Sequence, residues 1–129
     1  LATGSYKKSS LVLGLTNYKG LMTQEKRQSA EKLLSDNTVS EVRKMLKSVV
    51  SNGKAEKAYS SLVALSGKTG TAQSGIYDGS KEILRTWFSG FFPSDNPNYI
   101  VIVMNENGEG GNSDYAPVFR KICEGIVTR

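Results

Sequence analysis

The chain contains no histidine and a single cysteine, Cys123, among its 129 residues. One cysteine cannot form an internal disulfide, and a reactive thiol would need a nearby base, for which histidine is the usual choice. Cys123 lies near Phe119 and Ile126 at helical spacing, which indicates packing within a helix face. We expect neither a metal site nor a cofactor.

Long hydrophobic runs are also absent. No segment approaches the roughly 18 apolar residues of a membrane-spanning helix, and no signal-peptide pattern is present. With 38% hydrophobic residues, the chain is long enough to bury one core. We therefore expect residues 1–129 to form a single domain.

Acidic residues are scarce in the first half of the chain. Residues 1–64 contain eleven Lys and Arg against five Asp and Glu, whereas residues 65–129 contain six against seven. The lysines are scattered and have no aromatic residues interleaved, so the sequence gives no indication of nucleic-acid binding. We interpret the basic half as a solvated surface, and the alternative is contact with an anionic polymer or lipid head groups.

The most informative segment that is present is Lys68-Thr69-Gly70-Thr71-Ala72-Gln73, which follows an apolar run at 62–65. The apolar run predicts a buried strand that the hexapeptide continues. Because side chains alternate along a strand, the lysine and the glycine would share one face and the two threonines the other. An ammonium group, two hydroxyls and an open backbone are suited to binding a carboxylate and a developing oxyanion.

The surroundings of this hexapeptide argue against a simple surface turn. A Gly/Ser-rich turn follows at 74–80, and a second strand with a Trp-Phe-x-Gly pattern lies beyond it. A phosphate-binding loop is excluded, because its spacing requires a glycine where Leu62 stands and a helix where the turn lies.

The hexapeptide resembles the third active-site motif of the penicillin-binding transpeptidases, the lysine-threonine-glycine strand. Six further segments resemble stretches of the same family and follow one another in the same order. These segments are 11–20, 34–38, 42–53, 86–93, 99–104 and 116–119. One departure is Lys54, where the family usually has a threonine. The resemblance covers nearly the whole chain and implies the C-terminal portion of the penicillin-binding transpeptidase and β-lactamase-like fold.

The other two motifs of that family are expected to be missing. A serine acyl transferase needs a Ser-x-x-Lys nucleophile motif that opens an apolar helix, and a Ser-x-Asn motif. The letters of the first motif occur at Ser5, Ser29 and Ser51, but none of these serines precedes an apolar helical pattern. We therefore expect the nucleophile, the export signal and the membrane anchor to belong to an upstream part, and the chain alone to be inactive.

The two Ser-x-Asn matches, at Ser35 and Ser94, have structural explanations. Ser35 leads into a capping box, in which Thr38 would cap a helix and Glu41 would reach back. Ser94 lies between two prolines and two apolar segments, where a hairpin turn is expected.

The remaining pattern predicts an α+β fold in which an antiparallel sheet packs with helices. Three strands are recognisable, near 62–73, 84–92 and 98–105, with Trp87 in the core. A helix after Thr38 should end at Asn52-Gly53, with one face made of Val42, Met45, Leu46, Val49 and Val50.

Other segments are less regular. Pro117 should open a last helix whose sheet-facing residues are Val118, Ile122 and Ile126. Residues 11–16 are strand-like, residues 22–34 leave helix or strand open, and residues 106–114 read as a polar loop.

The resemblance implies a peptidoglycan D,D-transpeptidase, which cross-links stem peptides ending in D-Ala-D-Ala through an acyl-serine intermediate. Lys68 would be the catalytic residue of this segment, and Thr69, Gly70, Thr71 and Gln73 would bind substrate. β-Lactams would bind the same strand. The implied partner is the rest of the transpeptidase domain, and the implied location is the extracytoplasmic face of a bacterial membrane.

Two alternatives remain open, and one strand raises a separate question. The alternatives are a D,D-carboxypeptidase or β-lactamase-like hydrolase, and a non-catalytic peptide-binding module. The Trp-Phe-x-Gly-Phe-x-Pro strand favours the transpeptidase over the β-lactamase.

The segment Tyr99–Met104 is uncharged, rich in β-branched residues and free of proline. We expect its edge to self-associate or to be covered by residues 11–16.

Overall fold

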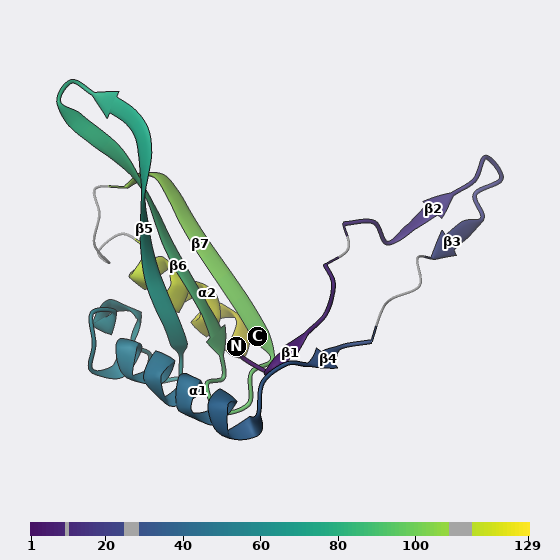
Figure 1. Ribbon diagram of the computed structural model, residues 1–129, viewed down its shortest axis with the longest axis horizontal. Coiled ribbons are helices and arrows are strands. Elements are labelled where there is room, and N and C mark those ends of the chain that lie inside the picture. Colours follow the sequence, from purple (N-terminus) through teal and green to yellow (C-terminus); the bar gives the residue numbers. More distant parts are fainter. Residues whose placement is uncertain (10, 25–28, 109–114) are drawn as a thin grey trace.

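The computed structural model describes residues 1–9, 11–24, 29–108 and 115–129. A body of one sheet and two helices carries an N-terminal arm that extends away from it (Figure 1). The body contains α1 (Asp36–Ser51), the 3-10 helix η1 (Glu56–Ala58), β5 (Ser66–Asp78), β6 (Lys81–Phe92), β7 (Tyr99–Gly108) and α2 (Ala116–Val127). The arm contains β1 (Ser5–Tyr6), β2 (Gly14–Thr16), β3 (Met22–Gln24) and β4 (Glu31–Lys32). The expected α+β fold is confirmed.

The body sheet has the order β5-β6-β7, and both pairs are antiparallel. Side chains alternate along β6, so that Phe88 points to the face covered by α2. The Phe88 ring lies 4.5 Å from the Phe119 ring of α2, measured between centroids. Gly90 permits this approach, because a Cβ atom there would lie 2.5 Å from the Phe119 ring.

The hydrophobic core lies between the α2 face of the sheet, the end of α1 and η1. Its buried members are Val50, Ala55, Ala58, Leu65, Phe88, Phe92, Tyr115, Ala116, Phe119 and Cys123. Cys123 is a buried free cysteine, and desolvation raises the pKa of its thiol to about 12. The expected packing role of Cys123 is therefore confirmed.

The side chains that α2 buries against the sheet differ from those expected. In α2 the buried residues are Ala116, Phe119 and Cys123, whereas Val118 and Ile122 are exposed, so the expected sheet-facing set was wrong in these two positions. Both sets fit a helical repeat, and the fit of the Phe119 ring against Phe88 decides between them.

The beginning of α1 also differs from expectation. Ser35 caps the helix by accepting the N–H of Thr38 at 3.2 Å, so Thr38 is not the cap. Glu41 forms an ion pair with Lys44 at 2.8 Å and does not close a capping box. The end of α1 at Ser51, with Asn52 as its C-cap, agrees with the prediction.

The strand boundaries were the least accurate predictions. β5 begins at Ser66 and not at Leu62, which is exposed. Ser66 is instead fixed at the strand start, because its buried hydroxyl lies 2.8 Å from the hydroxyl of Ser94 in the β6–β7 connection. The connection after Phe92 is a turn, as predicted. β7 continues to Gly108, and the rest of the expected polar loop lies outside the described residues.

The arm consists of two short antiparallel pairs, β1 with β4 and β2 with β3. Only part of the strand-like segment 11–16 is in a strand, and residues 22–34 contribute β3 and β4. The β2–β3 hairpin points away from β7 and does not cover it (Figure 1). Within the described ranges, neither helix has the length and apolar character that crossing a bilayer requires.

Candidate functional site

The hexapeptide that begins at Lys68 lies on β5, which is an edge strand in the described part of the sheet. The register pairs Lys68 with Ser89 and Thr69 with Phe88, so the lysine and the threonine side chains leave the strand on opposite faces, as predicted. Lys68 is exposed, and its ammonium group donates a hydrogen bond to the Thr69 carbonyl at 3.1 Å. An edge strand presents its unpaired backbone N–H and C=O groups to a ligand that lies alongside it.

Gly70 opens a space on the Lys68 face of the sheet. A Cβ atom at Gly70 would meet the Cβ of Trp87 at 3.5 Å, which is an ordinary contact. Trp87 lies opposite Gly70 on β6 and is 36% exposed, so its expected place in the core was wrong. The physical reason is the alternation of β6, which turns Phe88 toward α2 and Trp87 toward the open face.

Gly67, just before the motif, has a different role from Gly70. A Cβ atom at Gly67 would lie 2.4 Å from the Phe88 ring, on the face that α2 covers. The two glycines therefore have different roles. Gly67 makes room for the Phe88 ring in the core, and Gly70 leaves the surface of the strand open.

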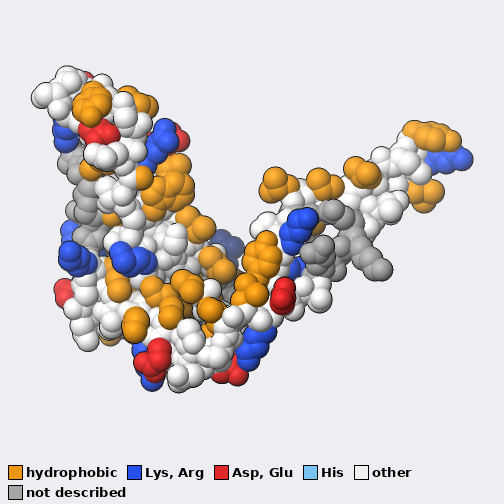
Figure 2. Space-filling view, viewed as in Figure 1, with side chains coloured by type: hydrophobic (Ala, Val, Ile, Leu, Met, Phe, Trp, Pro, Cys, Tyr) orange, Lys and Arg blue, Asp and Glu red, His pale blue; other side chains and the backbone are white. Residues whose placement is uncertain are grey.

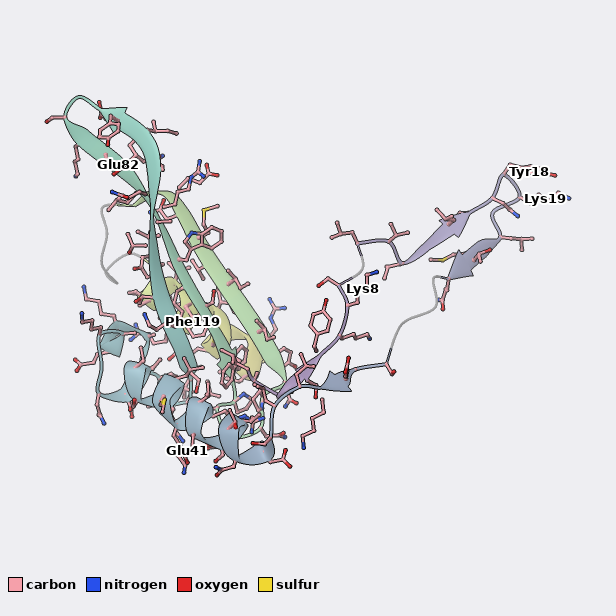
Figure 3. The ribbon with its side chains drawn as sticks, in the orientation of Figure 1. Lys8, Tyr18, Lys19, Glu41, Glu82 and Phe119 are labelled. Carbon is pink, nitrogen blue, oxygen red and sulfur yellow. The ribbon has the colours of Figure 1, made fainter. Side chains whose placement is uncertain are left out.

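Gln73 is held at the base of the hairpin tip rather than pointing freely from the strand. Its side-chain amide donates to Glu82 at 3.1 Å, and the other Glu82 oxygen accepts the N–H of Gly75 at 2.9 Å. Glu82 lies in the projecting β5–β6 hairpin (Figure 3). Sequence reasoning did not single out Glu82, because the register pairs Gln73 with Leu84 and Glu82 with Tyr77, and a register shift between Gln73 and Tyr77 separates the two pairs.

A second cation shares the face of Lys68. Arg85 lies opposite Ala72, two residues along β6 from Trp87, and is exposed. Neither Lys68 nor Arg85 forms an ion pair with a described residue. Sequence reasoning missed Arg85, and the signal that locates it is its even spacing from Trp87 along the strand. Two unpaired cations beside an open backbone suit an anionic ligand.

The serines that match the letters of the missing motifs occupy structural positions. Ser5 lies in β1, Ser29 precedes β4 and Ser51 is the last residue of α1, so none of these three begins a helix. Ser35 caps α1, and Ser94 is buried against Ser66. The described residues thus place a cation, two hydroxyls and an open glycine on β5, without a helix-positioned serine beside them.

Comparisons with known proteins agree with this arrangement. A family model described as the penicillin binding protein transpeptidase domain matches residues 1–124. The peptidoglycan D,D-transpeptidase MrdA of Haemophilus influenzae is 37% identical over an alignment of 84 residues, which covers 57% of this chain and 13% of that protein. A peptidoglycan D,D-transpeptidase FtsI homolog of Mesostigma viride is 33% identical over 103 residues, covering 74% of this chain and 17% of that protein.

Solved structures give the same result at the level of the fold. Apo penicillin-binding protein 3 of Mycobacterium tuberculosis superposes with a TM-score of 0.75 at 28% identity, over 98% of this chain and 32% of that one. Complexes of that protein with ampicillin and aztreonam superpose with TM-scores of 0.75 and 0.77, each at 26% identity. This chain therefore spans about a third of the solved protein and less than a fifth of the two relatives' length.

Proposed function

The chain belongs to the family of penicillin-binding protein transpeptidase domains, and we propose that it supplies the substrate-binding strand of a peptidoglycan D,D-transpeptidase. The observation that carries the proposal is the exposed edge of β5, where a cation, two hydroxyls and an open glycine lie in sequence. The segment works together with the rest of a transpeptidase domain, at the extracytoplasmic face of the membrane. Residues 1–129 form the C-terminal part of that domain.

Each residue of the motif has a role in this proposal. Lys68 assists proton transfer and attracts the anionic terminus of a D-Ala-D-Ala stem peptide. The hydroxyls of Thr69 and Thr71 bind that carboxylate, and the Thr71 N–H contributes to an oxyanion hole. Gly70 lets the peptide lie along the strand, and Gln73 lines the far end of the site. A β-lactam occupies the same strand in place of the peptide.

The reaction class is tested by the product formed. A complete transpeptidase domain that contains this segment is incubated with a D-Ala-D-Ala stem peptide and a D-amino acid as acceptor amine. Transpeptidation gives the peptide–amine adduct by mass spectrometry, with release of D-alanine. Release of D-alanine with no adduct at any acceptor concentration would assign the chain to the D,D-carboxypeptidases instead.

We expect Gly67→Ala to affect the stability of that complete domain and Gly70→Ala to affect its acylation rate. Gly67→Ala overpacks the core against Phe88, so it should lower the free energy of unfolding by about 1–3 kcal/mol. Gly70→Ala makes only an ordinary contact with Trp87 and should leave stability nearly unchanged, but it should slow acylation by a β-lactam because the added methyl group stands beside the substrate path. Thermal unfolding and acylation kinetics separate the two. An unchanged acylation rate in Gly70→Ala would contradict the assigned path.

We also propose that the isolated chain self-associates through the outer edge of β7. In the described part of the chain β7 has β6 as its one neighbouring strand, and Ile100 and Ile102 are 72% and 61% exposed. Such an uncharged edge is a template for pairing with another strand.

Sedimentation velocity and hydrogen exchange test this association. We expect the unsubstituted chain to form dimers or larger species with slow exchange at 100–103, and Ile102→Lys to be monomeric, because a charge on an edge strand blocks pairing. Leu62→Lys, at an exposed position outside the sheet, is the matched control and should associate normally. A monomer with fast exchange at 100–103 would refute the association.

A further inference from the structure

The largest exposure of hydrophobic side chains occurs on the arm, away from β5. Tyr18 and Leu15 are 93% and 74% exposed, and Leu21 and Met22 are exposed beside them. We call these four residues the apolar tip. Figure 2 shows hydrophobic side chains along the arm and at its end. Four neighbouring hydrophobic side chains exposed to water indicate an interaction surface.

The hairpin geometry distributes this apolar surface over both faces. β2 and β3 pair Leu15 with Thr23 and Thr16 with Met22, so the Leu15 and Met22 side chains point to opposite faces. A groove on a folded protein contacts one face of such a hairpin. A lipid interface surrounds both faces and the end.

The turn between the strands is built to present its residues outward. The Asn17 side-chain oxygen accepts the N–H groups of Lys19 and Leu21 at 2.9 and 3.0 Å, and Gly20 has a φ of +77° that favours glycine. Tyr18 and Lys19 consequently project from the end of the arm (Figure 3). The Lys19 ammonium lies 5.6 Å from the centroid of the Tyr18 ring.

The arm is net positive. Residues 1–32 contain six Lys and Arg against two Glu, and Glu31 lies in β4 at the base of the arm. Lys19 lies at the end of the arm, and Lys8 lies along the arm nearer the body (Figure 3), so one positive charge is at the apolar tip and another stands behind it. Each basic residue near an anionic membrane surface contributes about 1 kcal/mol to binding, and tyrosine is enriched at the membrane–water interface.

We propose that the apolar tip inserts into the interfacial layer of a bilayer that contains anionic lipid. Insertion is shallow, because β2 and β3 each have one neighbouring strand in the described chain and their outer backbone groups need water or head groups. An anionic polymer would engage the lysines but leave the apolar tip in water. A second copy of the arm would bring like charges together.

Vesicle flotation with the 129-residue chain tests the proposal. We expect binding to vesicles of phosphatidylglycerol and phosphatidylethanolamine, weaker binding to phosphatidylcholine alone, and loss of affinity as salt rises. A tip variant should lose about a hundredfold in affinity, since three exposed apolar groups no longer leave water. The tip variant is Leu15→Gln, Tyr18→Gln and Leu21→Gln. The matched control variant replaces three exposed hydrophobic residues elsewhere, Met45→Gln, Leu62→Gln and Ile76→Gln, and should bind within about twofold of the unsubstituted chain.

The charge contribution is tested separately. The double variant Lys8→Gln, Lys19→Gln should bind the anionic vesicles about 25-fold more weakly, because each charge contributes about fivefold. The double variant Lys57→Gln, Lys121→Gln is the matched control, and its affinity should change little. Circular dichroism establishes that each variant is folded.

Three outcomes would overturn the proposal. They are unchanged vesicle binding by the tip variant, absence of binding by the unsubstituted chain, and a dimer that the tip variant abolishes without vesicle binding by either protein. The last result would identify a second copy as the occupant.

Discussion

Replacing Lys68 with alanine in a complete transpeptidase domain that contains this segment should slow acylation by a β-lactam by about a hundredfold or more. The expected size follows from the loss of one positioned charge that assists proton transfer and attracts the substrate carboxylate. Lys68 is exposed and packs against no core residue, so the variant should unfold at nearly the same temperature as the parent protein. Acylation is measured as the second-order rate with a fluorescent penicillin.

Lys121→Ala is the matched control for this substitution. Lys121 is an exposed lysine on α2, the helix that covers the opposite face of the sheet, and its removal changes the net charge equally. We expect its acylation rate to equal that of the parent. A folded Lys68→Ala protein with the parent's rate would remove Lys68 from the reaction centre.

The second large effect concerns the 129-residue chain by itself, which should form no covalent adduct with a β-lactam. Acylation needs a serine at the start of an apolar helix beside the lysine strand. The serines that match the motif letters lie instead in a short strand, before β4 and at the last residue of α1. Intact-mass spectrometry after incubation with excess penicillin should therefore show the unmodified chain.

A complete transpeptidase domain treated in parallel provides the positive control, because it should gain the mass of one penicillin. A stable adduct on Ser5, Ser29, Ser35 or Ser51 of the isolated chain would contradict the assignment of the nucleophile to another part of the domain. Peptide mapping distinguishes such an adduct from non-specific acylation of lysines.

The sequence predicted the sheet because its signals are strong and local. The apolar run before Lys68, the Gly/Ser-rich turn and the Trp-Phe-x-Gly pattern predicted two strands joined by a turn, with the Lys68 motif on the first of them. Asn52 and Pro117 likewise marked helix boundaries correctly.

Other features depend on tertiary contacts that no local pattern contains. The start of β5 is set by the hydrogen bond between Ser66 and Ser94, which are 28 residues apart. Trp87 looked like a core residue by size, but the identity of the covered face depends on where α2 packs. The contact of Gln73 with Glu82 depends on a register shift between Gln73 and Tyr77, which hydrophobic periodicity does not encode.

The arm was the hardest region to predict. Its strands are two or three residues long and expose their hydrophobic residues, so the usual relation between apolar pattern and burial fails there. The same exposure is the observation from which we propose an interaction surface on the arm.

The most direct test of the central claim is a crystal structure of a complete transpeptidase domain that contains this segment, acylated by a β-lactam. We predict that the β-lactam lies along the outer edge of β5, with its carboxylate within about 2.7–3.2 Å of the Thr69 and Thr71 hydroxyls and Lys68 beside the acylated serine. A β-lactam whose carboxylate is held by other elements, with no contact to β5, would contradict the account.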